Sequence, residues 1–350
     1  MPSRPKQQHY VTRAYLEGFL DPGNKRLICY GRHKREAFQG QPGELARQRS
    51  YYSVREPDGT WNDSLEHEIE RAVEAPGLDV IRTLASGNTR IDWAQRDALA
   101  MLMAMQRFRV PHLRQVLDAV HADLVQGFLL EYEQRERHQG PGQLWFSTVS
   151  PLAQPGDLEG PRTYVRKDEL EEIQRSLQED PGQFSRETLF SLAVSFAKVF
   201  RRMKWTVHYS NRAAQFITSD CPVLLRHEGG DVDGAGVLRK DTHIEFPLSR
   251  NSLVSMTHDF ALMTHLNRLR ENREVRRVLA RVPEIRIEQA GEAEVREFNL
   301  NQARYCSRWA FCGHRNDGLV DILREPSKNV GHRIVREGDL IRLESLIGRP

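Results

Sequence analysis

The sequence predicts an α+β fold in which a mixed or largely antiparallel sheet is covered by long helices. Apolar residues at helical spacing dominate the first half of the chain, whereas short apolar runs typical of strands cluster after residue 205. This segregation argues against alternating βαβ units and a parallel doubly wound sheet. We expect one domain over residues 1–350, with a mostly helical half at about 1–140 and a sheet-containing half at about 160–320.

The N-terminal region begins with a predicted short helix. Residues 7–20 carry apolar side chains at helical spacing, and Gln8, His9 and Arg13 fall near the first turn of this helix. Weak alternation over residues 26–38 then predicts a hairpin.

Helical patterns fill most of residues 64–202. A helix that begins at Ser64 places Glu66 and Glu70 on one face, where they are either a metal-binding pair or a solvated surface. The longest pattern spans 92–133, and Pro111 is expected to kink or split it.

After these helices the chain changes to strands. A helical region at 167–202 leads into a strand at 205–209, which a tight turn joins to a second strand from residue 215. Further elements are strands at 243–248 and 252–256, a helix at 295–302 and a strand at 304–312.

The strand at 215–225 carries the strongest candidate for chemistry. Pro222 cannot donate to a strand ladder, so the carboxylate of Asp220 is expected at a strand end, free to face a cleft. In the alternative interpretation, Thr218, Ser219 and Asp220 only close a turn through hydrogen bonds from side chain to backbone.

Composition is that of a soluble globular protein, with 39% hydrophobic and 28% charged residues. No apolar run reaches the roughly 18 residues of a membrane helix, and a polar N-terminus without a signal peptide predicts a cytoplasmic protein. The four cysteines include no C-x-x-C pair, so we expect neither a disulfide framework nor a zinc site. We expect no cofactor, and oligomeric state stays open.

The basic residues are mostly arginine. Arginine outnumbers lysine 43 to eight, although the net charge is only +3. Guanidinium groups bind phosphate through two hydrogen bonds and stack on bases, which suits a nucleic-acid partner such as DNA. A GC-rich genome is the alternative explanation.

Two segments resemble a bacterial family of domains of unknown function. They are QHYVTRAYL at residues 8–16 and FITSDCPV at residues 216–223, followed by PLS at 247–249. The family has QHYVPRxYL-like and FITSDxPV-like motifs, and Thr12 stands where its usual residue is proline. The resemblance implies a cytoplasmic bacterial protein of defence loci and no particular chemistry, and it draws attention to His9, Arg13, Ser219 and Asp220.

Known catalytic motifs are incomplete. A metal nuclease with an Asp…Glu-x-Lys pattern needs a lysine after Glu245, where Phe246 and Pro247 stand instead. A serine hydrolase needs glycines beside its nucleophile, and Ser219 has none. A metal-free reaction run by carboxylates remains.

The sequence therefore favours a nucleic-acid-acting hydrolase of anti-phage defence, most simply a metal-independent DNA N-glycosylase. A carboxylate stabilises the cationic sugar in such a reaction. The expected catalytic residues are Asp220, His9 and Ser219, and the expected substrate-binding residues are Gln8, Tyr10, Arg13 and Thr218. A metal-dependent nuclease and a non-enzymatic module that binds nucleic acid or protein are the alternatives.

Overall fold

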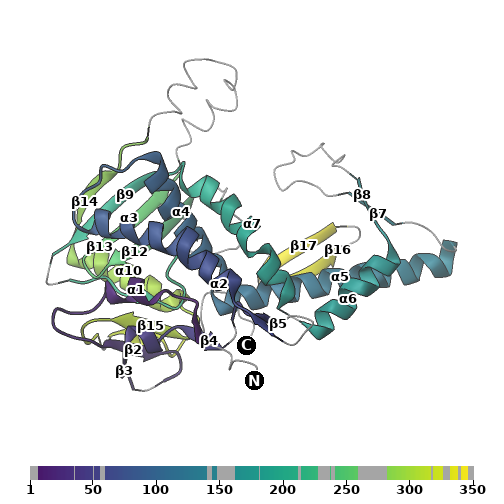
Figure 1. Cartoon of the computed structure of the whole chain (residues 1–350), viewed down its shortest axis with the longest axis horizontal. Helices are drawn as coiled ribbons and strands as arrows, with labels where there is room; N and C mark the ends of the chain where they lie inside the picture. The colour runs from purple at the N-terminus through teal and green to yellow at the C-terminus, as the bar shows by residue number, and fades with distance from the viewer. Residues whose placement is uncertain are drawn as a thin grey trace, which may run out of the picture. The chain divides into compact units, whose positions relative to one another are not determined.

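The structure is a computed structural model, and it confirms the α+β class that the sequence predicts (Figure 1). It describes residues 7–34, 36–49, 51–55, 60–139, 144–147, 162–180, 182–211, 214–227, 237, 241–258, 282–316, 318–325, 332–337 and 340–345. Within these residues, no helix has the length and apolar character needed to cross a membrane.

The helices of the described residues are α1 (Arg13–Glu17), η1 (Pro42–Glu44), α2 (Ser64–Ile69), the π-helix η2 (Glu70–Glu74), α3 (Ala75–Ala85), α4 (Trp93–Phe108), α5 (Pro111–Gln139), α6 (Lys167–Glu179), α7 (Gln183–Phe200), α10 (Glu292–Tyr305) and α11 (Gly318–Ile322). The strands are β1 (Gln7–His9), β2 (Leu27–Gly31), β3 (Phe38–Gly40), β4 (Arg47–Arg49), β5 (Val54–Arg55), β6 (Trp61–Asn62), β7 (Leu144–Ser147), β8 (Arg162–Val165), β9 (Lys204–Ser210), β10 (Thr218–Ser219), β11 (Leu224–His227), β12 (Thr242–Ser249), β13 (Ser252–Thr257), β14 (Arg286–Ala290), β15 (Trp309–Cys312), β16 (His332–Glu337) and β17 (Leu340–Ser345).

The chain forms two compact units. One unit contains residues 1–113, 189–331 and 345–350, and the other contains residues 114–188 and 332–344. The smaller unit has an apolar cluster between α5 and α6, and all sites discussed below lie in the larger unit.

A five-stranded sheet forms one half of the larger unit, with strand order β11-β12-β13-β9-β14. Only β14 runs parallel to its neighbour among these strands, so the sheet is mixed. Helices α3 and α4 lie over one face (Figure 1), where the guanidinium of Arg96 sits 4.1 Å from the centre of the Trp205 ring. Trp205 and Val207 of β9 share this face with Val254 and Met256 of β13, and the alternate residues, such as Leu253, face the other side.

A second, four-stranded sheet has the order β10-β15-β2-β3. Helix α10 packs against both sheets. Near its start, Val295 and Phe298 contact an apolar cluster that includes Leu253 of the five-stranded sheet. Near its end, Ala303 packs with Ala310 of the four-stranded sheet. The helix therefore contacts both sheets.

Several local predictions are confirmed. The hairpin of residues 26–38 forms as β2 and β3, strands form near 205–209, 243–248 and 252–256, and the long helical pattern splits before Pro111 into α4 and α5.

Two predictions are wrong. Gln8 and His9 belong to strand β1 rather than to the first turn of a helix, because β1 pairs with β4 and helix α1 begins only at Arg13. The segment 215–225 does not pair with 205–209: it contributes β10 to the four-stranded sheet and β11 to the five-stranded sheet. The residues between β10 and β11 therefore cross from one sheet to the other.

Candidate active site

The N-terminal motif borders an open cavity of about 440 Å³, called the His9 cavity below. Strand β1 and helix α1 supply one wall, and α2 with the π-helix η2 supplies another. The lining residues are His9, Thr12, Arg13, Ala14, Glu17, Tyr52, Glu66, Ile69, Glu70 and Glu74. Its volume is within the range of roughly 300–1,000 Å³ found for small-molecule sites.

The acidic wall of the cavity follows from helical spacing. Glu66, Glu70 and Glu74 recur every four residues, so they lie on one side of consecutive turns. The last of these turns is a π-helix, an irregularity that occurs frequently at functional sites. The spacing thus directs three carboxylates to the same cavity.

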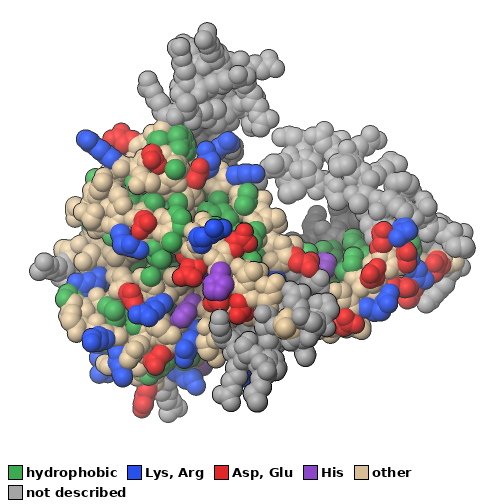
Figure 2. Space-filling model, viewed as in Figure 1, with side chains coloured by type: hydrophobic (Ala, Val, Ile, Leu, Met, Phe, Trp, Pro, Cys, Tyr) green, Lys and Arg blue, Asp and Glu red, His purple; other side chains and the backbone are tan. Residues whose placement is uncertain are grey.

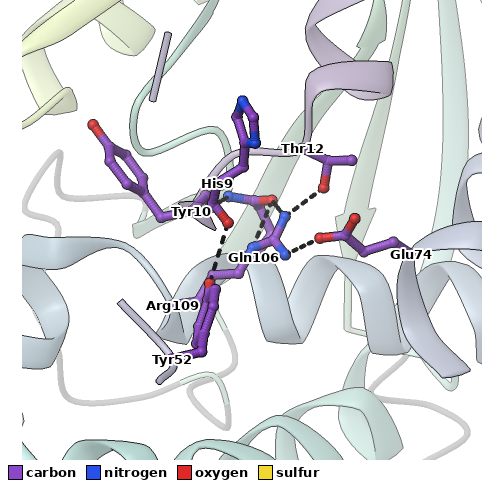
Figure 3. Close-up of polar contacts among 7 residues, drawn as sticks. All are labelled: His9, Tyr10, Thr12, Tyr52, Glu74, Gln106 and Arg109. Atoms are coloured by element: carbon purple, nitrogen blue, oxygen red, sulfur yellow. Dashed lines mark hydrogen bonds and ion pairs between the residues drawn. The ribbon is translucent and has the colours of Figure 1, made fainter. Parts of the chain in front are cut away.

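Arg109 supports this cavity from inside the fold (Figure 3). Its buried guanidinium forms an ion pair with Glu74 and donates to Thr12 Oγ1 at 2.6 Å and to Gln106 Oε1 at 2.5 Å. Burial alone would lower the pKa of Arg109, but the charge of Glu74 raises it. Gln106 in turn donates to the backbone carbonyl of Tyr10 at 2.7 Å. Helix α4 therefore fixes the segment that carries His9.

Gln8 lies beneath the cavity and is fully buried. Its side-chain amide donates to Glu66 Oε2 and to Ser53 Oγ, both at 3.0 Å. Its carbonyl oxygen accepts from the backbone N–H of Tyr52 at 2.6 Å. Both the amide group and the carbonyl oxygen of the Gln8 side chain are held by hydrogen bonds. Gln8 therefore positions Glu66 and is not accessible to a substrate.

His9 is partly buried at the cavity wall, and its Nε2 lies 3.2 Å from the carbonyl oxygen of Gly43. A carbonyl can only accept, so this contact favours the tautomer with the proton on Nε2 and a lone pair on Nδ1. Burial lowers the pKa of His9 below its usual 6.5, although the Gly43 contact opposes the shift. At neutral pH the ring is uncharged and able to act as a base.

Arg13, Glu17 and Glu70 are the exposed charged groups of the same cavity. The Arg13 side chain is 67% exposed and pairs with Glu17 at 2.8 Å. Because Gln8 holds Glu66 and Arg109 holds Glu74, exposed Glu70 is the carboxylate with most freedom to meet a ligand. Figure 2 shows histidine side chains among acidic and basic ones on one face of the molecule, without a single-sign patch.

Asp220 occupies a different place from the predicted one. Its side chain is buried, and its oxygens accept three backbone N–H groups: Ser307 at 2.8 Å, Arg308 at 2.7 Å and Trp309 at 3.2 Å. Burial raises the pKa of Asp220 to about 6, while these hydrogen bonds act to lower it. The prediction that this carboxylate is free to face a cleft is wrong, because the turn before β15 occupies it.

The neighbours of Asp220 are equally enclosed. Ser219 is fully buried, and its Oγ accepts from the backbone of Cys221 at 3.0 Å and from Gln302 at 2.8 Å. Thr218 shares a hydrogen bond of 2.9 Å with the Tyr15 hydroxyl. Of the three residues, only Ser219 makes the local hydrogen bond to backbone that the turn-closing alternative expects, whereas Thr218 and Asp220 bind residues far away in the sequence.

Tyr10 points away from His9 (Figure 3) and is buried. Burial, and then the charge of Asp220, raise the pKa of its hydroxyl. Of the seven predicted site residues, the structure thus brings only His9 and Arg13 into one cavity, with Gln8 directly behind it.

Sequence reasoning did not identify Gln106, Arg109 and Glu74. One signal was present: Gln106 and Arg109 are polar residues three apart at the end of the apolar helical run, where a core helix ordinarily has none. Such a pair in a buried helix requires partners, and here the partners belong to the N-terminal motif. Within the described residues, no three His, Cys, Asp or Glu side chains are grouped closely enough to hold a metal ion.

Comparison with family models identifies a family for this chain. The family model described as "Protein of unknown function (DUF4238)" matches residues 7–316, which include both motifs and every residue of the His9 cavity. No curated protein and no solved structure shows significant similarity to the chain.

Proposed function

The chain belongs to the DUF4238 family of proteins of unknown function, and we propose that it is a nucleic-acid-acting hydrolase of the DNA N-glycosylase type, with the His9 cavity as its active site. The resemblance to a bacterial family of defence loci supports a role in anti-phage defence in the cytoplasm. DNA is the proposed partner, and the reaction requires no cofactor.

The observation that supports this proposal most directly is the charge of the His9 cavity. Its wall has four carboxylates, from Glu17, Glu66, Glu70 and Glu74, against one lining cation, Arg13, and Arg109 behind the wall. Cleavage of a glycosidic bond develops positive charge on the sugar, which carboxylates stabilise. Attack on a phosphate concentrates negative charge, which the same carboxylates oppose. The cavity is therefore better suited to releasing a base than to metal-free strand cleavage.

The residues of the cavity provide the necessary steps. Nδ1 of His9 takes a proton from a water molecule, whose oxygen forms a bond to C1′ of the sugar. The bond from C1′ to the base nitrogen breaks, and the proton passes to the departing base. Exposed Glu70 stabilises the positive charge on the sugar. A general base and a carboxylate that act together in this way account for rate factors of about 10²–10⁴ each.

Basic residues beside the cavity suit the phosphates of the same strand. In the register of β1 with β4, Arg47 lies opposite His9 and Arg49 lies opposite Gln7, and both arginines are exposed. Arg13 also lines an adjoining cavity of about 400 Å³ together with Lys25. A DNA backbone held by these basic residues would place a base that is flipped out of the helix over the acidic wall of the His9 cavity.

The test incubates the purified full-length protein with DNA that contains either ordinary or modified bases, with and without EDTA. Half of each reaction is then heated in alkali. We expect free base and alkali-labile sites, with the same yield in EDTA.

Direct strand breaks that disappear in EDTA would replace the proposal with a metal-dependent nuclease. Tight DNA binding with neither product would indicate the non-enzymatic binding module instead.

A further inference from the structure

On the face opposite α3 and α4, the five-stranded sheet carries polar side chains beside apolar ones, such as Leu253, that pack against α10. Four strands each contribute one side chain to a row across this face: Glu288 from β14, His208 from β9, Ser255 from β13 and Glu245 from β12. Glu288 lies directly opposite His208 in the ladder, and Ser255 lies directly opposite Glu245. His208 lies directly opposite Leu253, and Ser255 is its diagonal neighbour, a position from which side chains on one face can still interact.

Within this row the hydroxyl of Ser255 lies 2.7 Å from Nε2 of His208. Nδ1 of the same ring lies 3.5 Å from Glu288 Oε2. The carboxylate only accepts, so it favours the proton on Nδ1 and leaves Nε2 to receive the proton of the serine. This order of nucleophile, base and orienting carboxylate is the arrangement of an activated serine, which is recognised by geometry rather than by sequence position.

A cavity of about 250 Å³ opens over the row, between the sheet and α10. His208 and Ser255 line it together with Arg226, Glu245 and Asn301. The His208 side chain is 22% exposed, so the pair of serine and histidine is reachable from this cavity. A side-chain pair that served only to hold two strands together would not require a cavity above it.

The same cavity is lined by the guanidinium of Arg226 and by the carboxylates of Glu245, Glu294 and Glu297. Glu245 is paired with Arg226, so the negative charge next to Ser255 is offset. Within the described residues, Nε of Arg226 is buried and has no hydrogen-bond partner. Arg226 and Asn301 both carry N–H groups, which are the donors that an oxyanion requires.

We propose that Ser255, His208 and Glu288 form a second active site that hydrolyses small carboxylic esters. The oxygen of Ser255 forms a bond to the carbonyl carbon as its proton moves to Nε2 of His208. The bond to the alkoxide leaving group breaks, and the leaving group takes that proton. A water molecule then attacks the acyl-serine, gives its proton to His208, and releases the carboxylic acid as the serine regains a proton.

The size of the cavity limits the substrate. About 250 Å³ is below the roughly 300–1,000 Å³ typical of drug-sized ligands, so the site accepts short acyl groups such as acetyl. The activity does not depend on the His9 cavity, since the two cavities share no lining residue.

The test treats the full-length protein with a fluorophosphonate probe and locates the adduct by peptide mass spectrometry. Hydrolysis of p-nitrophenyl acetate is measured in parallel. We expect one adduct, on Ser255, and its loss in Ser255→Ala. His208→Gln should slow both labelling and hydrolysis by about 10²-fold or more. Thr257→Ala, on the same strand and face as Ser255, is the matched control and should react as the original protein does.

Melting temperatures separate a chemical effect from misfolding in each variant. An adduct confined to other residues, or hydrolysis unchanged in a folded Ser255→Ala protein, would overturn the proposal. His9→Gln should leave labelling unchanged, so failure of the DNA-directed function and failure of the esterase site are distinguishable.

Discussion

Replacing Asp220 by asparagine separates the structural role of this residue from a catalytic one. The substitution preserves shape but exchanges one carboxylate oxygen for an NH₂ group. Oδ1 accepts from Ser307, and Oδ2 accepts from both Arg308 and Trp309. The least costly orientation therefore keeps the amide oxygen at the Oδ2 position and turns the NH₂ group towards the backbone N–H of Ser307.

The cost follows from these contacts. One charge-assisted hydrogen bond worth about 1.5–3 kcal/mol is lost, two others become neutral, and two donors now face each other in a buried site. Asparagine carries no charge, and burial disfavours the charged form of Asp220, whose pKa it raises to about 6. Loss of the charge therefore offsets part of the destabilisation. We expect a net loss of about 1–3 kcal/mol in the free energy of unfolding, or roughly 2–6 °C in melting temperature for a unit of this size.

The assay is thermal unfolding of Asp220→Asn beside Asp79→Asn, an exposed aspartate paired with Arg82 whose replacement should cost no more than about 0.5 kcal/mol. Well below its melting temperature, the Asp220→Asn variant should release base from the DNA substrate at a rate within about threefold of that of the original protein. A variant that melts normally but has lost activity would refute this reasoning and restore Asp220 as a catalytic carboxylate.

Three further predictions concern the His9 cavity and its surroundings. Arg109→Met should lower the free energy of unfolding, measured by urea titration, by about 3–5 kcal/mol, because Glu74 is left charged and mostly buried. A loss under about 1 kcal/mol would contradict the supporting role of Arg109. Because burial lowers the pKa of His9, its neutral form persists below pH 6.5. The rate of base release should therefore fall only at more acidic pH. A fall in rate with its midpoint above pH 6.5 would show that another group titrates. If Arg47 and Arg49 contact phosphates, replacing both by Gln should weaken DNA binding and reduce the slope of log affinity against log salt by about 2, and an unchanged slope would place the DNA elsewhere.

Local sequence patterns predicted most of the helices and strands but few of the strand pairings. Strands β12 and β13 follow from apolar alternation on either side of the turn at residues 250–251, and they pair with each other as neighbours in sequence usually do. Strand β10 instead pairs with β15, about ninety residues further along the chain. A strand of two residues carries too little pattern to specify so distant a partner.

The structure brings only His9 and Arg13 of the predicted site residues into one cavity, for a similar reason. His9 and Arg13 reach one cavity because strand β1 and helix α1 meet there, and both residues were recognisable from their chemistry. Asp220 looked equally reactive, but its partners are backbone N–H groups of residues 307–309, which leave no trace in a side-chain pattern. Buried carboxylates that bind backbone in this way resemble catalytic ones until the fold is known.

Single-turnover base release measures the hydrolysis that we assign to the His9 cavity. The rates of His9→Gln and Glu70→Gln are compared with Glu68→Gln, an exposed residue of α2 that does not line the cavity. We predict that the first two variants lose about 10²–10⁴-fold in rate with unchanged melting temperatures, while Glu68→Gln retains the full rate. Full activity in a folded His9→Gln protein would contradict this assignment.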